Sequence, residues 1–159
     1  MQKLLISAAL LAGLAATAAQ AAPLSQKNIS LEQANGLAGA AVKACMDKSY
    51  QVTVTVVDRA GVITAVQRTD SAGPHTVKAS AMKAYTALST KNPSGKVMES
   101  AQSNAGAQNI RDIPGLLLLA GGVPIKSGNE VIGAIGIGGA PGGHLDEECA
   151  LRALEKVQL

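Results

Sequence analysis

The sequence predicts an α+β domain in which helices cover an antiparallel sheet of about five strands. Three observations favour this class. Some segments alternate apolar and polar residues with a period of two, others carry apolar residues at helical spacing, and successive strands are joined by short connections. The expected order is one helix, two strands, one or two helices, three strands and a final helix.

The first helix is expected from Ser30 to about Lys48. Ser30 and Gln33 have the spacing of a capping box, in which each side chain bonds the backbone of the other residue. The small and apolar positions that follow recur at helical spacing and form one stripe: Ala34, Leu37, Ala38, Ala41 and Cys45. Cys45 is therefore expected to face the interior.

A β-hairpin and a second helix are expected next. Residues 51–58 alternate valines with threonines, residues 59–61 form the turn, and residues 62–68 form the returning strand. A loop over residues 69–74 leads to a helix at about 75–90. Its apolar residues recur at helical spacing on one face: Val77, Ala81, Ala84, Tyr85 and Leu88.

The following region is interpreted as a short helix and two strands. The helix is expected at about 96–104, after the interruption by Pro93 and Gly95. The apolar runs 116–120 and 123–126 lie on either side of two glycines, and both are interpreted as strands. The last helix of the chain is expected to reach about Val157.

The most informative segment is a glycine-rich strand that follows a hairpin turn at residues 127–129. Val131, Ile135 and Ile137 lie on one face of this strand. Its other face is nearly bare, because it carries only small residues: Ala134, Gly136 and Gly138. A bare face indicates close approach of another group, and two interpretations stay open, a packed helix or a flat ligand.

The N-terminal residues have the pattern of a cleavable secretory signal. Lys3 precedes an apolar run at residues 4–14, and small residues lead to Ala21. We therefore expect a signal peptide at 1–21, one domain at 22–159, and a periplasmic or secreted location. The apolar run is too short to span a membrane, so no transmembrane anchor is expected after cleavage.

Export to an oxidising compartment bears on Cys45 and Cys149, the two cysteines of the sequence. We expect them to form an intramolecular disulfide. The alternative is a pair of reduced thiols buried in the core. Zinc binding by the pair is not expected, because no further ligand lies near either cysteine at zinc-site spacing.

Composition and motifs exclude several function classes. The formal net charge is +3, the basic residues do not cluster, and there is no Trp or Phe, so nucleic acid binding is not supported. The sequence lacks a nucleophile elbow and a P-loop, and residues 136–141 lack the last glycine of a dinucleotide fingerprint. No catalytic residue is assigned, and whether the protein is an enzyme stays open.

The two histidines, His75 and His144, are the candidate metal ligands. Both lie beside Pro and Gly where a helix is expected to begin, and neutral imidazole is a common iron ligand. The alternative is a solvated or capping imidazole. Ala79, Met82 and Thr86 follow His75 at helical spacing and form a strip that suits either a planar ring or ordinary helix packing.

Other polar side chains lie near the second helix. Arg68, Lys78 and Lys83 can pair with ligand carboxylates, or can lie solvated on the surface. Tyr85 can ligate iron, donate a hydrogen bond, or lie half-buried in the core. Residues 146–148 are acidic and begin the last helix, where the helix dipole accounts for negative charge.

Five separated segments cover nearly all of the chain after residue 21: 56–61 (VVDRAG), 68–72 (RTDSA), 83–87 (KAYTA), 121–125 (GGVPI) and 133–140 (GAIGIGGA), followed by Asp146 and Glu147. Together and in this order they resemble the GlcG/HbpS haem-binding family. The resemblance implies a profilin-like fold with a central antiparallel sheet, symmetric homo-oligomers, and binding of haem or a related tetrapyrrole.

With this resemblance, the expected function is exported haem binding for sequestration, transport or redox sensing. His75 is the expected axial iron ligand, and His144 is a second ligand if the glycine-rich loop folds toward the same pocket. The remaining candidate cofactor contacts are Arg68, Lys78, Met82, Lys83 and Tyr85, with Arg68 or Lys83 near the propionates. Two alternatives stay open. One is a haem-free oligomeric module that signals to a membrane sensor partner or carries a small metabolite, and the other is an enzyme of unassigned reaction.

Overall fold

The computed structural model describes residues 21–158, so the predicted signal peptide lies outside the described residues except for its last position. The elements, in chain order, are α1 (Leu31–Met46), β1 (Thr53–Asp58), β2 (Ile63–Arg68), α2 (His75–Thr90), α3 (Ser94–Ser103), the 3-10 helix η1 (Ala105–Asp112), β3 (Gly122–Ser127), β4 (Glu130–Gly138) and α4 (Gly143–Leu154).

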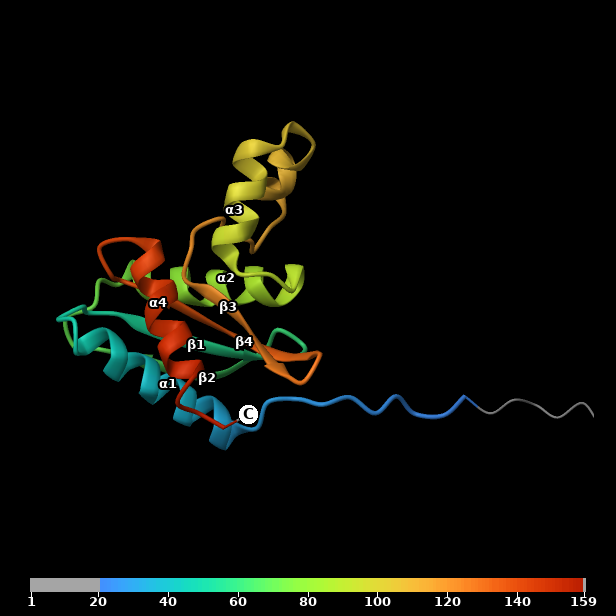
Figure 1. Cartoon of the computed structure of the whole chain (residues 1–159), viewed down its shortest axis with the longest axis horizontal. Coiled ribbons are helices and arrows are strands. Elements are labelled where there is room, and N and C mark those ends of the chain that lie inside the picture. Colours follow the sequence, from blue (N-terminus) through green and yellow to red (C-terminus); the bar gives the residue numbers. More distant parts are fainter. Residues whose placement is uncertain (1–20, 159) are drawn as a thin grey trace, which may run out of the picture.

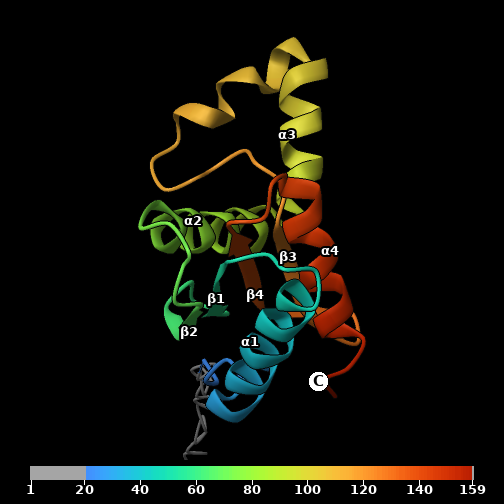
Figure 2. The ribbon, with the colours of Figure 1, turned by 90° about the vertical axis from the view of Figure 1, so that its left-hand side faces the viewer.

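The four strands form one antiparallel sheet in the order β2-β1-β4-β3. Helices α1 and α4 cover one face of the sheet and α2 covers the other, which the two perpendicular views show (Figures 1 and 2). The α3 and η1 segments project away from these layers. The predicted α+β class is confirmed. Within residues 21–158, no helix has both the length and the apolar character needed to cross a membrane.

Helix α1 begins with the predicted capping box. The Ser30 Oγ accepts a hydrogen bond from the Gln33 backbone N–H at 3.1 Å, and the Gln33 Oε1 accepts one from the Ser30 backbone N–H at 3.1 Å. These two bonds satisfy backbone groups that a helix start otherwise leaves unpaired. The predicted stripe from Ala34 to Cys45 is buried against the sheet and α4.

The main core lies between the sheet and the α1–α4 layer. The even-numbered valines of β1 and the isoleucines Ile135 and Ile137 of β4 fill it. Cys45 of α1 and Cys149 of α4 form a disulfide inside this core, with their Cα atoms 5.4 Å apart. The expected disulfide is present, and the alternative of two buried thiols is wrong.

The disulfide is expected to contribute strongly to stability, because it closes a loop of 104 residues in the unfolded chain. Chain-entropy arguments give a loss of about 4 to 5 kcal/mol in the free energy of unfolding for Cys45→Ala/Cys149→Ala. Urea denaturation followed by circular dichroism measures this loss. A double variant as stable as the parent protein would contradict it, and a count of free thiols in the unfolded, non-reduced parent protein is the control.

The bare face of the glycine-rich strand β4 is covered by helix α2. A Cβ atom added at Gly136 would lie 2.1 Å from the Ser80 carbonyl oxygen and 2.5 Å from the Ala84 backbone nitrogen. The backbones of strand and helix are therefore in direct contact. Of the two interpretations left open by the sequence, the packed helix is correct for this stretch of the strand.

Hydroxyl pairs join the same helix to the neighbouring strand β1. The Thr53 and Thr76 hydroxyls are 2.7 Å apart and the Thr55 and Ser80 hydroxyls are 2.8 Å apart, and all four residues are buried. The face of α2 that packs on the sheet is thus largely polar. The face that the apolar pattern selected is partly exposed instead, since Val77 is 44% and Tyr85 is 41% exposed.

The predicted strand at 116–120 is wrong, and the sheet has four strands. The Leu117 backbone N–H donates to the Thr86 Oγ1 at 2.8 Å, and the Leu119 carbonyl accepts from the Ser94 Oγ at 2.7 Å. Side chains of α2 and α3 therefore satisfy backbone groups that a strand would direct at a neighbouring strand. The 3-10 helix η1, which the sequence did not predict, precedes this segment.

Gly136→Ala is expected to destabilise the protein by about 3 kcal/mol, because the added methyl group meets helix backbone that cannot move alone. Gly36→Ala is the matched control. That position lies in α1, an added Cβ atom meets nothing within 4 Å, and alanine is favoured over glycine by up to about 1 kcal/mol in a helix. Thermal or urea unfolding compares the two, and equal effects would contradict the direct contact of α2 and β4.

Candidate functional site

A hollow of about 430 Å³ lies where the starts of α2 and α4 meet the loop that follows β4. His75 and Ala79 of α2 line it, together with Leu119 and residues 138–143. Its volume is within the range of small-molecule and cofactor sites, about 300 to 1,000 Å³. The buried charged residues Lys83 and Asp146 also line this space, and we call them the floor of the hollow.

The floor is an ion pair with almost no solvent exposure. Lys83 is 1% and Asp146 is 2% exposed. The Lys83 Nζ donates to the Asp146 Oδ2 at 2.7 Å and to the Ile137 carbonyl at 2.9 Å. The Asp146 Oδ1 accepts from the Ala140 backbone N–H at 3.0 Å. The pair therefore ties α2 to the end of β4, to the glycine-rich loop and to the first turn of α4.

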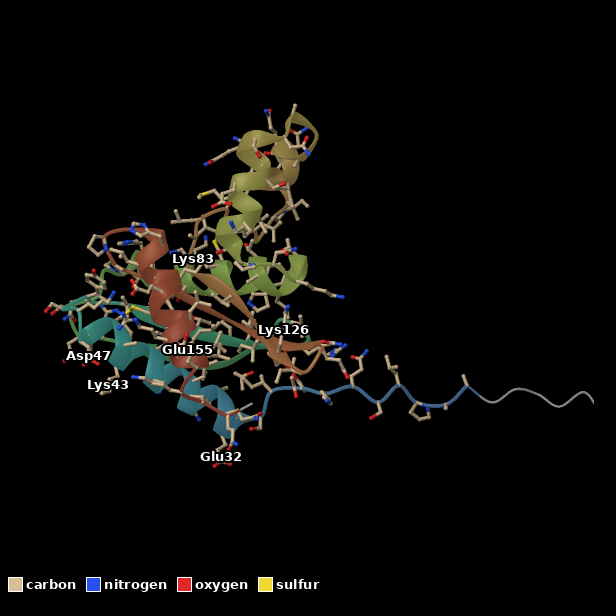
Figure 3. The ribbon with its side chains drawn as sticks, in the orientation of Figure 1. Glu32, Lys43, Asp47, Lys83, Lys126 and Glu155 are labelled. Carbon is tan, nitrogen blue, oxygen red and sulfur yellow. A yellow bond between two sulfur atoms is a disulfide. The ribbon has the colours of Figure 1, made fainter. Side chains whose placement is uncertain are left out.

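Figure 3 shows how Lys83 differs from the other labelled charged residues. Lys83 lies between helices, whereas Lys43 and Asp47 lie together on the outer surface of α1. A glycine makes room for the buried pair. Gly121 has a φ of +119°, and a Cβ atom there would lie 2.8 Å from the Asp146 Cβ and 3.0 Å from the Lys83 Nζ.

Burial raises the pKa of the Asp146 carboxyl above its ordinary value. The hydrogen bond from Lys83 and the positive charge of that ammonium oppose part of the rise, as does the bond from Ala140. Desolvation is thus the largest influence on this carboxyl. A pair in such surroundings contributes less to stability than its short distance suggests, but breaking it leaves one buried charge without a partner.

His75 is the first residue of α2 and its side chain is exposed at the hollow. The imidazole ring lies against Gly73, where an added Cβ atom would be 2.7 Å from the His75 Cε1. The ring is therefore folded back over the chain that enters the helix. It remains accessible to a ligand in the hollow.

The structure separates the other predicted contacts from His75. Met82 and Tyr85 line a different, mostly apolar hollow of about 290 Å³. His144 lines a third hollow of about 400 Å³ between α3 and α4. Only Lys83, of the predicted cofactor contacts, shares the hollow of His75.

The two remaining predicted cations lie at the surface. Arg68 ends β2, is exposed, and donates to the Ala72 carbonyl. Lys78 is exposed on α2. The predicted strip of Ala79, Met82 and Thr86 does not form one wall of a single cavity. Ala79 lines the hollow of His75, Met82 lines the other apolar hollow, and Thr86 is buried and donates to the Met82 carbonyl at 2.8 Å. A haem-sized gap between α2 and the glycine-rich strand is also absent from the described residues, since the two are in contact at Gly136.

Sequence reasoning missed Asp146 as a partner of Lys83. The helix dipole accounted for an acidic residue at this position, so no local signal singled it out. The two residues are 63 positions apart, and only the fold brings them together. Among residues 21–158, no group of three or more His, Cys, Asp or Glu side chains is arranged to hold a metal ion.

The ion pair yields a stability prediction. Lys83→Met is expected to lower the free energy of unfolding by about 3 to 5 kcal/mol, because it leaves the Asp146 carboxylate buried and unpaired. Lys83→Met/Asp146→Leu is expected to recover most of this loss, since no buried charge remains. Urea denaturation of both single variants and the double variant gives the coupling energy.

The exposed pair Lys43 and Asp47 is the control for this cycle, since its coupling should be within about 0.5 kcal/mol. Additive losses at Lys83 and Asp146, with no recovery in the double variant, would contradict a coupled buried pair.

Comparison with known proteins identifies the family. A family model described as "Haem degrading protein HbpS-like" matches residues 29–155, and the chain belongs to this HbpS-like family. A double mutant of HbpS from Streptomyces reticuli, solved as a crystal structure, has 34% sequence identity to this chain. It superposes with a TM-score of 0.79, over 88% of this chain and 99% of that one.

Two further structures share the fold. The protein ORFY of Klebsiella pneumoniae is 26% identical, with a TM-score of 0.80 over 86% of this chain and 94% of that one. PduOC, solved as a complex with heme, is 21% identical, with a TM-score of 0.74 over 82% of this chain and 96% of that one. At that identity the likeness to PduOC shows the fold alone.

Proposed function

We propose that this member of the HbpS-like family is an exported protein that binds haem in the hollow at the start of α2, with His75 as the axial iron ligand. The observation that carries the proposal is the exposed imidazole of His75 on a hollow of about 430 Å³. The family description, which names haem degradation, and the heme complex of PduOC support haem as the ligand.

The residues of the hollow fit the chemical needs of haem. The imidazole of His75 offers a nitrogen ligand, and the apolar side chains of Ala79, Leu119, Ala140 and Pro141 would contact a porphyrin bound there. The hollow is open, so part of the ring would stay in solvent. Bound haem would supply redox and ligand-binding chemistry at its iron, which the protein tunes through ligand identity and burial.

The contribution of the other predicted residues follows from their positions. Arg68 or Lys83 is the predicted cation for the propionates, and of these two Lys83 lines the hollow of His75. Lys78 lies exposed on α2 outside that hollow. Met82, Tyr85 and His144 line other hollows and are not part of this proposal. The proposed haem site therefore includes fewer residues than the sequence predicted.

Export, assembly and purpose also belong to the proposal. The signal pattern at residues 1–21 and the disulfide between Cys45 and Cys149 both suit an oxidising compartment outside the cytoplasm. In that compartment the protein would sequester or transport haem, or sense redox state. A symmetric homo-oligomer and a membrane sensor partner remain predictions from the family resemblance.

Titration of the purified protein with hemin tests the proposal. We expect a sharp Soret band that saturates at one haem per chain, and at least a tenfold loss of affinity in His75→Ala, because that variant removes the iron ligand. His144→Ala is the matched control and should bind as the parent protein does, since His144 lines a different hollow.

Other results would assign the site or the function differently. If His75→Ala binds hemin as the parent protein does and Tyr85→Phe loses affinity, haem would be assigned to the hollow lined by Met82 and Tyr85. A spectrum that remains that of free hemin would favour the haem-free module. The family description favours haem degradation as a second candidate, and bleaching of the Soret band with ascorbate in air, faster than for free hemin, would support it.

A further inference from the structure

The ammonium group of Lys83 has a hydrogen-bond donor to spare. A lysine ammonium carries three N–H donors. Two of them donate to Asp146 and to the Ile137 carbonyl, and no described residue accepts the third. The side chain is buried, and it lines the hollow together with Ala79, which lies one helical turn before it. An unused donor on a buried charge is costly unless a ligand or water accepts its hydrogen bond.

We propose that the floor of the hollow is a binding site for a small monocarboxylate, with the third N–H of Lys83 donating to one carboxylate oxygen. A free organic acid can provide that carboxylate without haem. A propionate group of haem provides the same chemistry, and only in that form does the inference rest on the proposed haem binding.

The charges at the floor favour a single negative charge on the ligand. The ligand's carboxylate would meet the Lys83 ammonium first, and Asp146, 2.7 Å from the Lys83 Nζ, offsets part of that positive charge. A dianion such as phosphate would place its second charge near the Asp146 carboxylate, which repels it. His75 and the backbone amide of Gly143 add donors along the hollow, because the N-cap Gly142 has no side chain to occupy that amide. The amides of Leu145 and Asp146 already donate to the Gly142 carbonyl.

The walls of the hollow favour a short apolar body on the acid. Ala79 lies on the α2 side, and Leu119, Ala140 and Pro141 lie on the loops opposite. Burial of one further CH₂ group strengthens binding about fourfold. Affinity should therefore rise from acetate to propionate and butyrate, until the hollow is filled.

Titration of the haem-free protein with these three acids tests the site. The pH and ionic strength are held constant, and the backbone amides of Ala140, Gly142 and Gly143 are followed by ¹⁵N NMR. We expect saturable shifts of these amides with millimolar dissociation constants that decrease along the series. Acetamide and inorganic phosphate should bind at least tenfold more weakly than acetate. Acetamide has no negative charge, and the phosphate dianion carries a second negative charge that the Asp146 carboxylate repels.

Ala79→Leu is the variant that keeps the ion pair and fills the hollow, so it should abolish the shifts while the protein stays folded. Ala81→Leu is its matched control, because Ala81 lies on the same helix but lines the hollow of Met82 and Tyr85. Absence of saturable shifts with all three acids in the folded protein would overturn the proposal. Equal binding by Ala79→Leu would also overturn it, because the acid would then lie elsewhere.

Hemin and hemin dimethyl ester distinguish the two sources of the carboxylate. If a propionate occupies the floor, hemin should bind at least tenfold more tightly than its ester and should displace butyrate. If the acids bind but the ester matches hemin, the site is one for free acids. Failure of hemin to bind at all would end the haem proposal and leave the free-acid site standing.

Discussion

The direct contact between the backbone of α2 and the backbone of β4 determines the geometry of the whole molecule on that side of the sheet. Gly136 allows the Ser80 carbonyl to approach where a side chain would otherwise stand. Only at this short distance can Thr76 and Ser80 of the helix reach the hydroxyls of Thr53 and Thr55 on the next strand. The position of α2 along the sheet is therefore fixed by backbone contact and directional bonds together, and not by apolar burial alone. Close-packed interiors adjust only in small steps, so this contact also sets the positions of His75 and Lys83, which lie on α2.

The same contact explains why charged and hydroxyl groups are tolerated inside the protein. Among residues 21–158, no buried side-chain nitrogen or oxygen lacks a hydrogen-bond partner. The Lys83 ammonium bonds both the carbonyl of Ile137 and the carboxylate of Asp146, and that carboxylate in turn holds the Ala140 amide of the loop. An apolar pair of similar volume would often be at least as stable. What the ion pair adds is a defined position for the glycine-rich loop, because each of its bonds has one direction and one partner.

Local patterns in the sequence were sufficient for the elements whose partners are near in the chain. The capping box at Ser30, the alternation of valine and threonine in β1, and the turn before β4 all act within a few residues, and all three predictions are confirmed. The orientation of α2 was not predictable in this way. Its buried hydroxyls are satisfied by Thr53 and Thr55, more than twenty positions away, and a polar residue looks exposed until such a partner is known. The segment 116–120 was mistaken for a strand for the same reason, since its backbone partners are the side chains of Thr86 and Ser94. Of the residues predicted for the site, His75 and Lys83 line one hollow, whereas the separation of His144 and Tyr85 into other hollows depends on the tertiary fold.

The hollow is held between two independent anchors, and this bears on how it can bind. On one side α2 is fixed by its contact with β4. On the other side α4 is fixed by the disulfide at Cys149, which lies three positions, or about one helical turn, after Asp146. The loop between β4 and α4 is thus attached at both ends and is bonded at Ala140 in the middle. A site whose walls are held in this way does not have to order them when a ligand arrives, so little of the binding free energy is spent on the protein. In the proposed site, the exposed ring of His75, which no such anchor holds, would be the part best able to adjust to a ligand, whereas the floor beneath it would select for charge and size.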